Sequence, residues 1–194
     1  MRRAICMTPR TTLYGGDLNC SAGLQPGCGV VFKLSKGGAF TVLYSFAGGS
    51  TDGSLASGLF RDSKGNRYGT TRSAAVPAAT GRSGRWIRPT RRPFCTTFGG
   101  GKTGGWGPLE SVVRDAAGNL YGTTENGGAG QCGSGCGTVF KLATTGKSTV
   151  LHSFEFSDGT YPVGELIWDG KGKLYGTASE GGPANYGTVW KLTP

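Results

Sequence analysis

The stretch "GNLYGTT" at residues 118–124 recurs as "GNRYGTT" at 65–71 and as "GKLYGTA" at 172–178. The copies start at intervals of 53 and 54 residues, from 65 to 118 and from 118 to 172. A fixed period of this length is typical of repeat architectures, in which each period folds into one structural unit. We therefore expect one unit about every 50 residues.

Two more motifs keep the same order around this stretch. "GTVFKL" at 137–142 returns as "GVVFKL" at 29–34 and "GTVWKL" at 187–192, and "TVLHSF" at 149–154 returns as "TVLYSF" at 41–46. These runs alternate apolar with polar residues and are rich in Val, Thr and aromatic residues, which favours β-strands. Gly-Asn, Gly-Gly and Asp-Gly sequences between them indicate turns. Each motif therefore predicts one short strand.

The unit from 106 to 154 predicts a four-stranded antiparallel meander, and we expect regular antiparallel strands throughout 106–194. One such unit cannot bury both of its faces, so neighbouring units must stack. With 38 glycines the chain is also a poor helix former. The predicted fold class is all-β, a propeller-like array of four-stranded repeats of about 50 residues. A β-sandwich is the alternative, because strand spacing alone does not distinguish the two.

The net charge of +10 would suggest an anionic partner such as nucleic acid. However, nine of the twelve arginines lie in two segments that contain no Asp or Glu, at positions 2, 3, 10, 72, 82, 85, 88, 91 and 92. The remaining chain is almost neutral, so we expect no nucleic-acid partner. No run approaches the roughly 20 apolar residues of a membrane span, and no signal peptide is visible.

The arginine-rich stretch "RSGRWIRPTRRPFCTTF" at 82–98 occupies the place where one copy of the repeat motifs is missing. Read one nucleotide earlier, the codons of Phe94 and Cys95 must contain a Leu triplet, and the next triplet must encode His or Tyr. Positions 93–98 can then read T-V-L-H-D-F, and positions 80–86 can read Y-G-T-V-W-R-L. We therefore interpret 72–98 as a frameshifted repeat and predict that it is irregular or poorly packed.

The first residues behave in the same way, because "MRRAICM" shifted by one nucleotide can read D-A-A-G-N-L-Y. The predicted organisation is an out-of-frame start at 1–10, a partial first copy and the start of a second copy at 11–71, the frameshifted segment at 72–98, and the third and partial fourth copies at 99–194. Sequencing the source DNA tests this hypothesis.

The pattern "GNLYGTT…GG…GTVFKL…TVLHSF…DG…P" resembles the GloVer tandem repeat of bacterial proteins with varied cell-surface anchors. The residues that carry the resemblance are 118–124, 127–128, 137–142, 149–154, 158–159 and Pro162. It covers roughly 10–72 and 98–194. The resemblance implies propeller-like repeats, an extracellular or cell-surface location, and a chain that is a fragment with fewer copies than usual. It implies no catalytic residues.

Four cysteines lie in equivalent loops, just before the "GVVFKL" and "GTVFKL" strands. Cys20 and Cys28 form one pair, and Cys132 and Cys136 form the other. Local disulfides fit an exported protein. A zinc site is the alternative, but it would need two more Cys or His ligands nearby, and the chain has one His. We expect disulfides and no metal or other cofactor. Cys6 and Cys95 fall in the shifted segments and carry no prediction.

His152 stands where another copy has Tyr44, which indicates a packing side chain with a polar tip rather than a catalytic base. Asp62, Asp115 and Asp169 each precede a Gly turn. We interpret them as acceptors for backbone N–H groups of that turn, and not as calcium ligands, because the EF-hand spacing is absent. "GGGKTGG" at 99–105 lacks the spacing of a phosphate-binding loop.

Repeated aromatic residues could line a sugar-binding surface or form the core between units. They are Tyr68, Tyr121, Tyr175, Trp106, Trp168 and Trp190. We favour the core, because repeat faces must be buried against their neighbours.

No catalytic set is recognisable, so the sequence favours a non-enzymatic exported module with a binding or structural role at the cell surface. Its ligand is unknown, with polysaccharide as one candidate. The alternative is a propeller enzyme that acts on glycans or cell-wall polymers through loop carboxylates such as Glu110, Glu125 or Glu165. A nucleic-acid binder would rest on the arginine segments alone.

Overall fold

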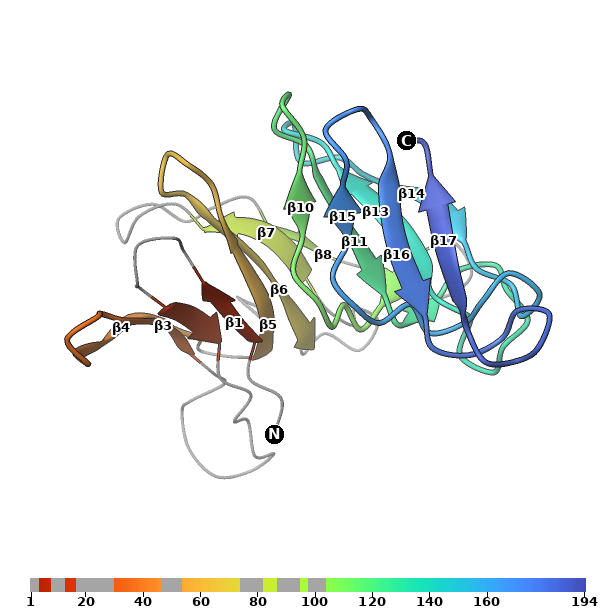
Figure 1. Ribbon diagram of the computed structural model, residues 1–194, viewed down its shortest axis with the longest axis horizontal. Helices are drawn as coiled ribbons and strands as arrows, with labels where there is room; N and C mark the ends of the chain where they lie inside the picture. Colours follow the sequence, from red (N-terminus) through yellow and green to blue (C-terminus); the bar gives the residue numbers. More distant parts are fainter. Residues whose placement is uncertain are drawn as a thin grey trace.

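Each repeat forms its own antiparallel sheet in the computed structural model of the chain (Figure 1). The structure describes the backbone of residues 4–7, 13–16, 30–46, 54–73, 82–86, 95–97 and 104–194, and the side chains of 30–46, 58–71 and 104–194. Within these residues there are strands and turns but no helix, and hence no helix able to cross a membrane. The predicted all-β class is confirmed.

In the described residues there are five sheets, and the strands of the four larger ones lie side by side in chain order. The first sheet contains β1 (Ala4–Met7), β2 (Leu13–Gly16), β3 (Val30–Leu34) and β4 (Phe40–Ser45). The second contains β5 (Ser54–Arg61), β6 (Arg67–Ser73), β7 (Arg82–Trp86) and β8 (Cys95–Thr97). The third contains β10 (Val113–Arg114), β11 (Leu120–Thr124), β13 (Thr138–Leu142) and β14 (Ser148–Ser153). The fourth contains β15 (Ile167–Trp168), β16 (Leu174–Ala178) and β17 (Thr188–Leu192), and the short strands β9 (Gly105–Trp106) and β12 (Asn126–Gly127) pair with each other. Regular antiparallel strands in 106–194 are thereby confirmed.

The register explains why the repeat needs a glycine after Leu-Tyr. Gly122 pairs with Phe140 across β11 and β13, and Gly176 pairs with Trp190 across β16 and β17. A Cβ atom on either glycine would overlap the aromatic ring opposite it. The ring therefore lies over bare backbone, and this contact links the "LYGT" motif to the "TVFKL" motif.

Apolar clusters join each sheet to the next, and we call the face turned toward the following sheet the front face and the opposite one the back face. Val31 and Phe46 of the first repeat pack on Leu59 of the second. Tyr68 of the second sheet packs on the back face of the third, which carries Phe140. The front face of the third sheet meets Leu174, Trp168, Trp190 and Leu192 of the fourth.

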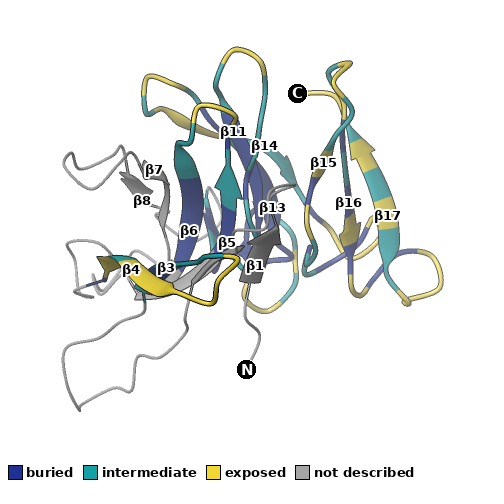
Figure 2. Ribbon diagram, turned by 60° about the vertical axis from the view of Figure 1, so that its left-hand side comes forward, coloured by how far each residue is buried: buried dark blue, intermediate teal, exposed yellow. Residues whose placement is uncertain are grey.

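This arrangement is that of a propeller and not of a two-sheet sandwich. The third sheet is covered on both faces, as the buried strands β11 and β13 show in Figure 2. The first strands of successive sheets also approach each other, β1 with β5 and β10 with β15. In a propeller, sheets are arranged radially around an axis, so both observations follow from that geometry.

Residues 72–98 were predicted to be irregular or poorly packed, and irregularity is wrong for the strands β7 and β8. β7 pairs with β6, and β8 pairs with β7, so the second sheet has four strands like the first and third. The physical reason is that backbone groups at the edge of β6 need partners whatever side chains follow. The side chains of these two strands, and residues 74–81 and 87–94, lie outside the described part of the chain.

β7 begins 52 residues after β3, at positions 82 and 30, as the shifted reading of the codons requires. Gly69 of β6 pairs with Gly84 of β7. In the first, third and fourth sheets the residue opposite this glycine is Phe32, Phe140 or Trp190. The shifted reading places Trp at position 84. The register therefore agrees with the frameshift hypothesis, which remains a prediction.

At the N-terminus the structure and the shifted reading differ. The shifted reading puts a Leu-Tyr pair at positions 6 and 7, whereas the structure uses Leu13–Gly16 as the second strand, with Leu13 opposite Leu34 and Gly15 opposite Phe32. In the third sheet Leu120 lies opposite Leu142, and Gly122 lies opposite Phe140, in the same register. The plain sequence "LYGG" at 13–16 was thus a copy of the motif that the sequence analysis missed.

The substitution Gly122→Ala tests the contact between glycine and the aromatic ring. We expect it to lower the free energy of unfolding by about 1–3 kcal/mol, because the added methyl group overlaps the Phe140 ring. Chemical denaturation measures the change. Gly133→Ala is the matched control, because a Cβ atom at Gly133 has no neighbour within 4 Å. Equal stability of the two variants would contradict the role of this contact.

The substitution Gly84→Trp tests whether an aromatic residue is missing from the second sheet. We expect it to raise the melting temperature, since a cross-strand aromatic contact adds about 0.2–1 kcal/mol. Gly37→Trp controls for a ring added at an open turn, where no atom lies within 4 Å. If both variants melt at the same temperature, position 84 is not the place of a lost aromatic residue.

Candidate functional site

The repeated Asp of the turn after the first strand binds three groups within its own repeat. One carboxylate oxygen of Asp115 accepts the backbone N–H of Asn119 (2.8 Å), and the other accepts the Asn119 side-chain amide (2.8 Å) and the Tyr121 hydroxyl (3.0 Å). Asp62 makes the same three bonds with Asn66 and Tyr68 at the same distances. The interpretation of these residues as turn stabilisers is confirmed, and the tyrosine partner is new.

The third copy of this turn is simpler. Lys173 replaces the asparagine, and Asp169 accepts only the backbone N–H groups of Lys171 (2.7 Å) and Lys173 (3.0 Å) among its described contacts. These bonds are the principal reason that the pKa of Asp169 is lowered.

The titration of Asp115 and Tyr121 is coupled through their hydrogen bond. Burial opposes ionisation of Asp115, but the hydrogen bonds from Asn119, Tyr121 and Gly118 outweigh it and lower its pKa below 3.8. Burial, followed by the hydrogen bond to Asp115 and its negative charge, raises the pKa of Tyr121 to about 12. The pair therefore holds an ionised carboxylate and a neutral phenol across the physiological range.

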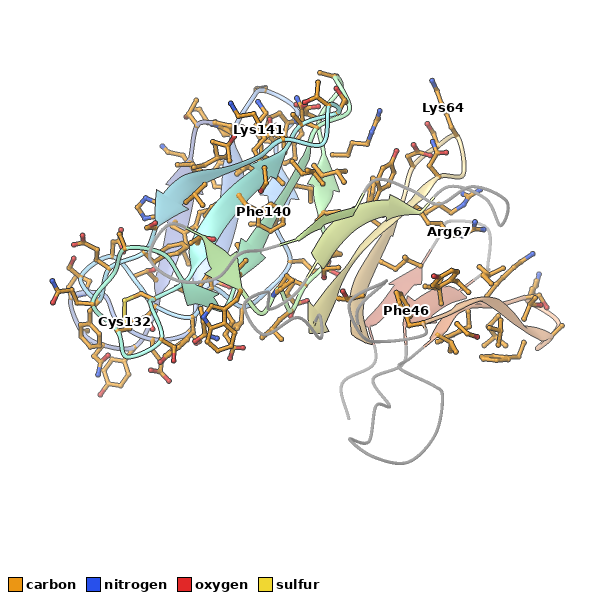
Figure 3. All side chains as sticks on the ribbon, turned by 180° about the vertical axis from the view of Figure 1, so that it is seen from behind. Phe46, Lys64, Arg67, Cys132, Phe140 and Lys141 are labelled. Carbon is orange, nitrogen blue, oxygen red and sulfur yellow. A yellow bond between two sulfur atoms is a disulfide. The ribbon has the colours of Figure 1, made fainter. Side chains whose placement is uncertain are left out.

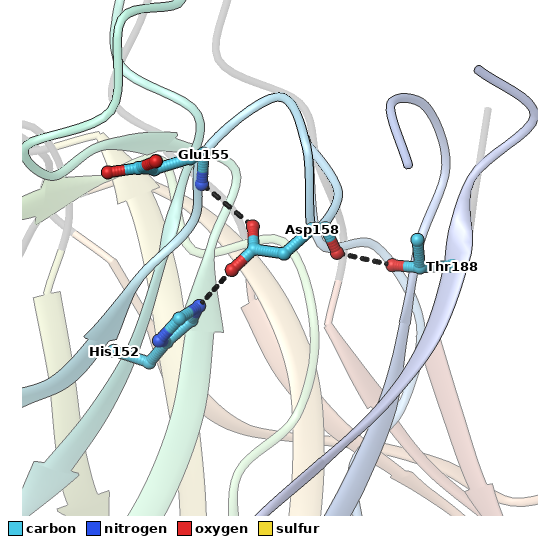
Figure 4. A network of polar contacts seen from close by, with 4 residues as sticks. All are labelled: His152, Glu155, Asp158 and Thr188. Carbon is cyan, nitrogen blue, oxygen red and sulfur yellow. Dashed lines mark hydrogen bonds and ion pairs between the residues drawn. The ribbon is translucent and has the colours of Figure 1, made fainter. Parts of the chain in front are cut away.

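A second polar cluster joins the third and fourth repeats at the ends of their sheets (Figure 4). The Nε2 atom of His152 lies 2.8 Å from Oδ2 of Asp158, and Oδ1 of Asp158 accepts the backbone N–H of Glu155 at 2.8 Å. The Thr188 hydroxyl donates to the Asp158 carbonyl at 2.8 Å. Asp158 therefore holds the imidazole, its own loop and the start of β17 together.

The imidazole of His152 is positioned by packing as well as by Asp158. It meets the Phe154 ring edge-on, with centroids 4.8 Å apart, and Tyr44 meets Phe46 in the same way at 5.1 Å. This confirms His152 as a packing side chain with a polar tip. Its bond to Asp158 is a contact that sequence reasoning missed, although Asp158 belongs to the repeated Asp-Gly motif.

A hollow of about 220 Å³ opens beside this cluster, between β14 and β17. Its apolar walls come from Val139, Phe154, Trp190 and Leu192, and His152 and Asp158 form part of its rim. The two rim side chains keep 37% and 44% of their surfaces exposed, so they are accessible. The indole N–H of Trp190 is buried and has no hydrogen-bond partner among the described residues.

Most of the repeated aromatic residues serve the core. Tyr68 and Tyr121 are buried, Trp168 stacks on Tyr121 with centroids 5.2 Å apart, and Trp190 meets the Phe154 ring at 5.5 Å. Tyr175 and Trp106 are half-buried. The preference for core over an aromatic binding surface is therefore confirmed for Tyr68, Tyr121 and Trp168, whereas Trp190 belongs to both the core and the hollow.

The comparison with protein families decides what kind of chain this is. The model of the Gloeobacter/Verrucomicrobia repeat matches residues 4–194. The chain belongs to this repeat family. The match extends through the arginine-rich stretch, and no curated protein matches the chain.

Solved structures similar to this member of the Gloeobacter/Verrucomicrobia repeat family are propeller enzymes. A gluconolactonase from Xanthomonas campestris is 14% identical, with a TM-score of 0.55, over 97% of this chain and 55% of its own. A virginiamycin B lyase from Staphylococcus aureus is 13% identical, with a TM-score of 0.52, over 99% and 56%. A luciferin-regenerating enzyme is 14% identical, with a TM-score of 0.51, over 98% and 60%. These likenesses show the fold alone, and the chain spans little more than half the length of each protein.

Cys132 and Cys136 are joined by a disulfide in the loop before β13, with their Cα atoms 5.1 Å apart. Cys132 lies among the loops at the opposite end of the third sheet from Lys141 (Figure 3). Cys20 and Cys28, the equivalent pair in the first copy of this family repeat, lie outside the described residues. No group of three or more His, Cys, Asp or Glu side chains that could hold a metal occurs in the part of the chain that is described.

The three loop carboxylates named from the sequence occupy the same end of their sheets. Glu110 precedes β10, Glu125 follows β11 and Glu165 precedes β15. Because the strands are antiparallel, these positions share the end at which β14 finishes, where His152 lies. The glutamates flank the first two strands of their sheets, whereas His152 lies on β14, the last strand of the third sheet. The three glutamates and His152 therefore lie at one end of the sheets but at different positions across them.

The substitution Asp115→Asn tests the coupled pair. At neutral pH it should lower the free energy of unfolding by about 1.5–3 kcal/mol, the range for hydrogen bonds to a charged group. The pKa of Tyr121 should fall from about 12 toward 10.0, because the negative charge beside the phenol is gone. Denaturation and the ultraviolet titration of tyrosine measure the two effects.

The pH dependence follows from the directions of the shifts. The lowered pKa of Asp115 contributes stability above pH 3.8 that disappears as the pH falls through the folded value, and the raised pKa of Tyr121 contributes stability that disappears between pH 10 and about 12. The variant should lose the acid slope and keep a smaller alkaline slope, because burial still raises the pKa of Tyr121. Asp169→Asn is the control, since Asp169 has no tyrosine partner, and a tyrosine titration that changes equally in both variants would contradict the coupling.

Proposed function

We propose that this chain is a non-enzymatic, exported repeat module that binds a polysaccharide at a cell surface. The observation that carries the proposal is the hollow between β14 and β17, which combines aromatic walls with a polar, accessible rim. Sugar rings present apolar C–H faces and many hydroxyl groups, so they suit a site that has an aromatic surface beside hydrogen-bonding side chains.

The size of the hollow supports recognition of part of a polymer. Its volume of about 220 Å³ is below the roughly 300–1,000 Å³ that is typical of sites for drug-sized ligands. One ring of a longer chain suits it better than a whole cofactor.

Exposed aromatic side chains on the neighbouring loops extend the site. Phe156 is 54% exposed and Tyr186 is 90% exposed. Their loops touch, because the backbone N–H of Gly182 donates to the Phe156 carbonyl at 2.8 Å. A polysaccharide that places one ring in the hollow could therefore continue across these two loops.

One observation supports binding rather than catalysis, and another supports export of the protein from the cell. Among the described residues the imidazole of His152 bonds Asp158, and no hydroxyl or thiol is bonded to it, so a nucleophile activated by His152 is absent there. The disulfide between Cys132 and Cys136 needs an oxidising compartment to persist, which supports export.

The alternative is a propeller enzyme that acts on glycans. The contact between His152 and Asp158 favours it, since a carboxylate that orients an imidazole is a common arrangement in general-base catalysis. Glu110, Glu125 and Glu165 at the same end of the sheets supply further carboxylates. The two functions differ in whether the bound glycan is cleaved.

Binding to a panel of bacterial exopolysaccharides and peptidoglycan fragments tests the proposal. We expect tryptophan fluorescence to change on binding, because Trp190 lines the hollow, and no new reducing ends to appear. His152→Ala should weaken binding by about tenfold through the loss of one rim contact. Thr145→Ala, in the exposed turn between β13 and β14, is the matched control.

Each other outcome has a definite meaning. Failure of the wild-type chain to bind any glycan in the panel would contradict the proposed function. Release of reducing ends that is abolished by Asp158→Asn would establish the enzyme instead. Equal binding by the His152 and Thr145 variants would place the site elsewhere on the chain.

A further inference from the structure

In the second, third and fourth repeats, the short turns that follow the first or third strand of a sheet gather at one end. They are residues 62–66, 115–119, 143–147 and 169–173. The Cζ atom of Arg114 lies 5.9 Å from the centroid of the Tyr68 ring, and Tyr121 stacks on Trp168 with centroids 5.2 Å apart. Each contact joins residues beside the turns of neighbouring repeats. We call this end of the array the turn end, and Figure 1 shows its turns toward the top of the view.

Basic and acidic side chains are separated between the two ends of these three repeats. Every described Lys and Arg lies at the turn end, where the acidic residues are the aspartates of the turns. The other described acidic residues lie at the opposite end, and they are Glu110, Glu125, Glu155, Asp158, Glu165 and Glu180. Figure 3 shows Lys64 and Lys141 far from Cys132, which lies at that opposite end. The almost neutral charge of the repeats therefore conceals one positive and one negative end.

The exposed cations of the turn end are lysines. They are Lys64, Lys147, Lys171 and Lys173. Among the described side chains, the ion pair that forms joins His152 to Asp158 at the opposite end. At the turn end, the carboxylates of Asp62 and Asp115 accept hydrogen bonds from the asparagine and tyrosine of their own repeats. The lysine charges therefore remain available to a partner.

The exposure of the turn end does not depend on which repeats lie beside it. The third sheet is covered on both faces, and Thr145 and Lys147 in its turn are still exposed. The second sheet packs between the first and the third, and Lys64 in its turn is exposed as well. Neighbouring sheets pack on faces, whereas the turns lie at the ends of the strands. A further repeat would therefore lengthen the turn end and leave it open.

We propose that the turn end binds an anionic polysaccharide, a polymer of uronic-acid type, on a surface separate from the hollow. The carboxylates of such a polymer recur along its length, as the lysines recur from repeat to repeat. Several weak contacts on one polymer add up, because each contact after the first forms within the same complex. A single small anion would meet one turn alone. The proposal does not depend on a glycan in the hollow.

The side chains of the turn end favour a polysaccharide over nucleic acid and over a membrane. In the described part of these repeats, the exposed aromatic side chains are Phe156 and Tyr186, and both lie at the opposite end, so bases would find no ring to stack on. The turns consist of Asp, Asn, Ser, Thr, Ala, Gly and Lys, with no large apolar side chain to enter lipid. Lysine is a compact point charge, which suits carboxylates that have no fixed orientation.

Calorimetric titration with polygalacturonate, and with its fully methyl-esterified form, tests the proposal. The ester has the same backbone without charge, so we expect the wild-type chain to bind the acid form alone. Binding should weaken steeply between about 20 and about 300 mM salt, because salt screens exposed charges. A variant with Lys64→Gln, Lys147→Gln and Lys171→Gln should bind at least about tenfold more weakly. Its melting temperature should not change, since all three side chains are exposed.

A second triple variant separates the position of the charge from its amount. Gln131→Glu, Ser157→Glu and Ala184→Glu change the net charge equally, but at exposed positions of the opposite end. This variant should bind polygalacturonate within about twofold of the wild type, because that end is distant from the polymer. His152→Ala, which changes the rim of the hollow, should also bind it like the wild type.

Three outcomes would overturn the proposal. One is a wild-type chain that does not bind polygalacturonate, or that binds the ester equally well. Another is an equal loss of binding in the two triple variants, which would show an effect of net charge alone. The last is tighter binding to duplex DNA or to phosphatidylglycerol vesicles than to polygalacturonate, since the partner would then be a nucleic acid or a membrane.

Discussion

Each repeat sheet has two apolar faces and can bury them only against other sheets. The third sheet shows the satisfied state, in which Val112 and Val139, on opposite faces, are both fully buried. The cross-strand contact of Gly122 with Phe140 lies on the same back face, on which Tyr68 of the second sheet packs. The order of the sheets and their radial arrangement follow from this need to stack.

Polar side chains in the array divide into two kinds. Asp62 and Asp115 bind groups of their own turn, and their hydrogen bonds are saturated by an asparagine and a tyrosine that recur with them. Asp158 instead connects two repeats and keeps an exposed carboxylate beside an apolar hollow. The first kind stabilises a strand connection, whereas the second leaves an exposed polar group at the edge of the hollow.

The sequence could predict what repeats and what is local. The period, the strand motifs, the role of the Asp turns and the core position of Tyr121 all follow from side-chain types at fixed spacings. The irregularity expected for 72–98 failed at β7 and β8, because backbone pairing to an existing edge tolerates unfavourable side chains. The hollow could not be predicted, since it depends on the distance and angle between the third and fourth sheets, which the order of residues does not give.

By itself, the sequence determined the all-β class, the four-strand unit and the family, because alternation, turn residues and period are properties of a single chain read in order. Only the tertiary structure decided which face of each sheet is covered, that His152 meets Asp158, and that Val189 is open where Val139 is buried. The physical reason is that burial belongs to pairs of sheets. Two repeats with the same residues differ in exposure when one has a neighbour and the other does not.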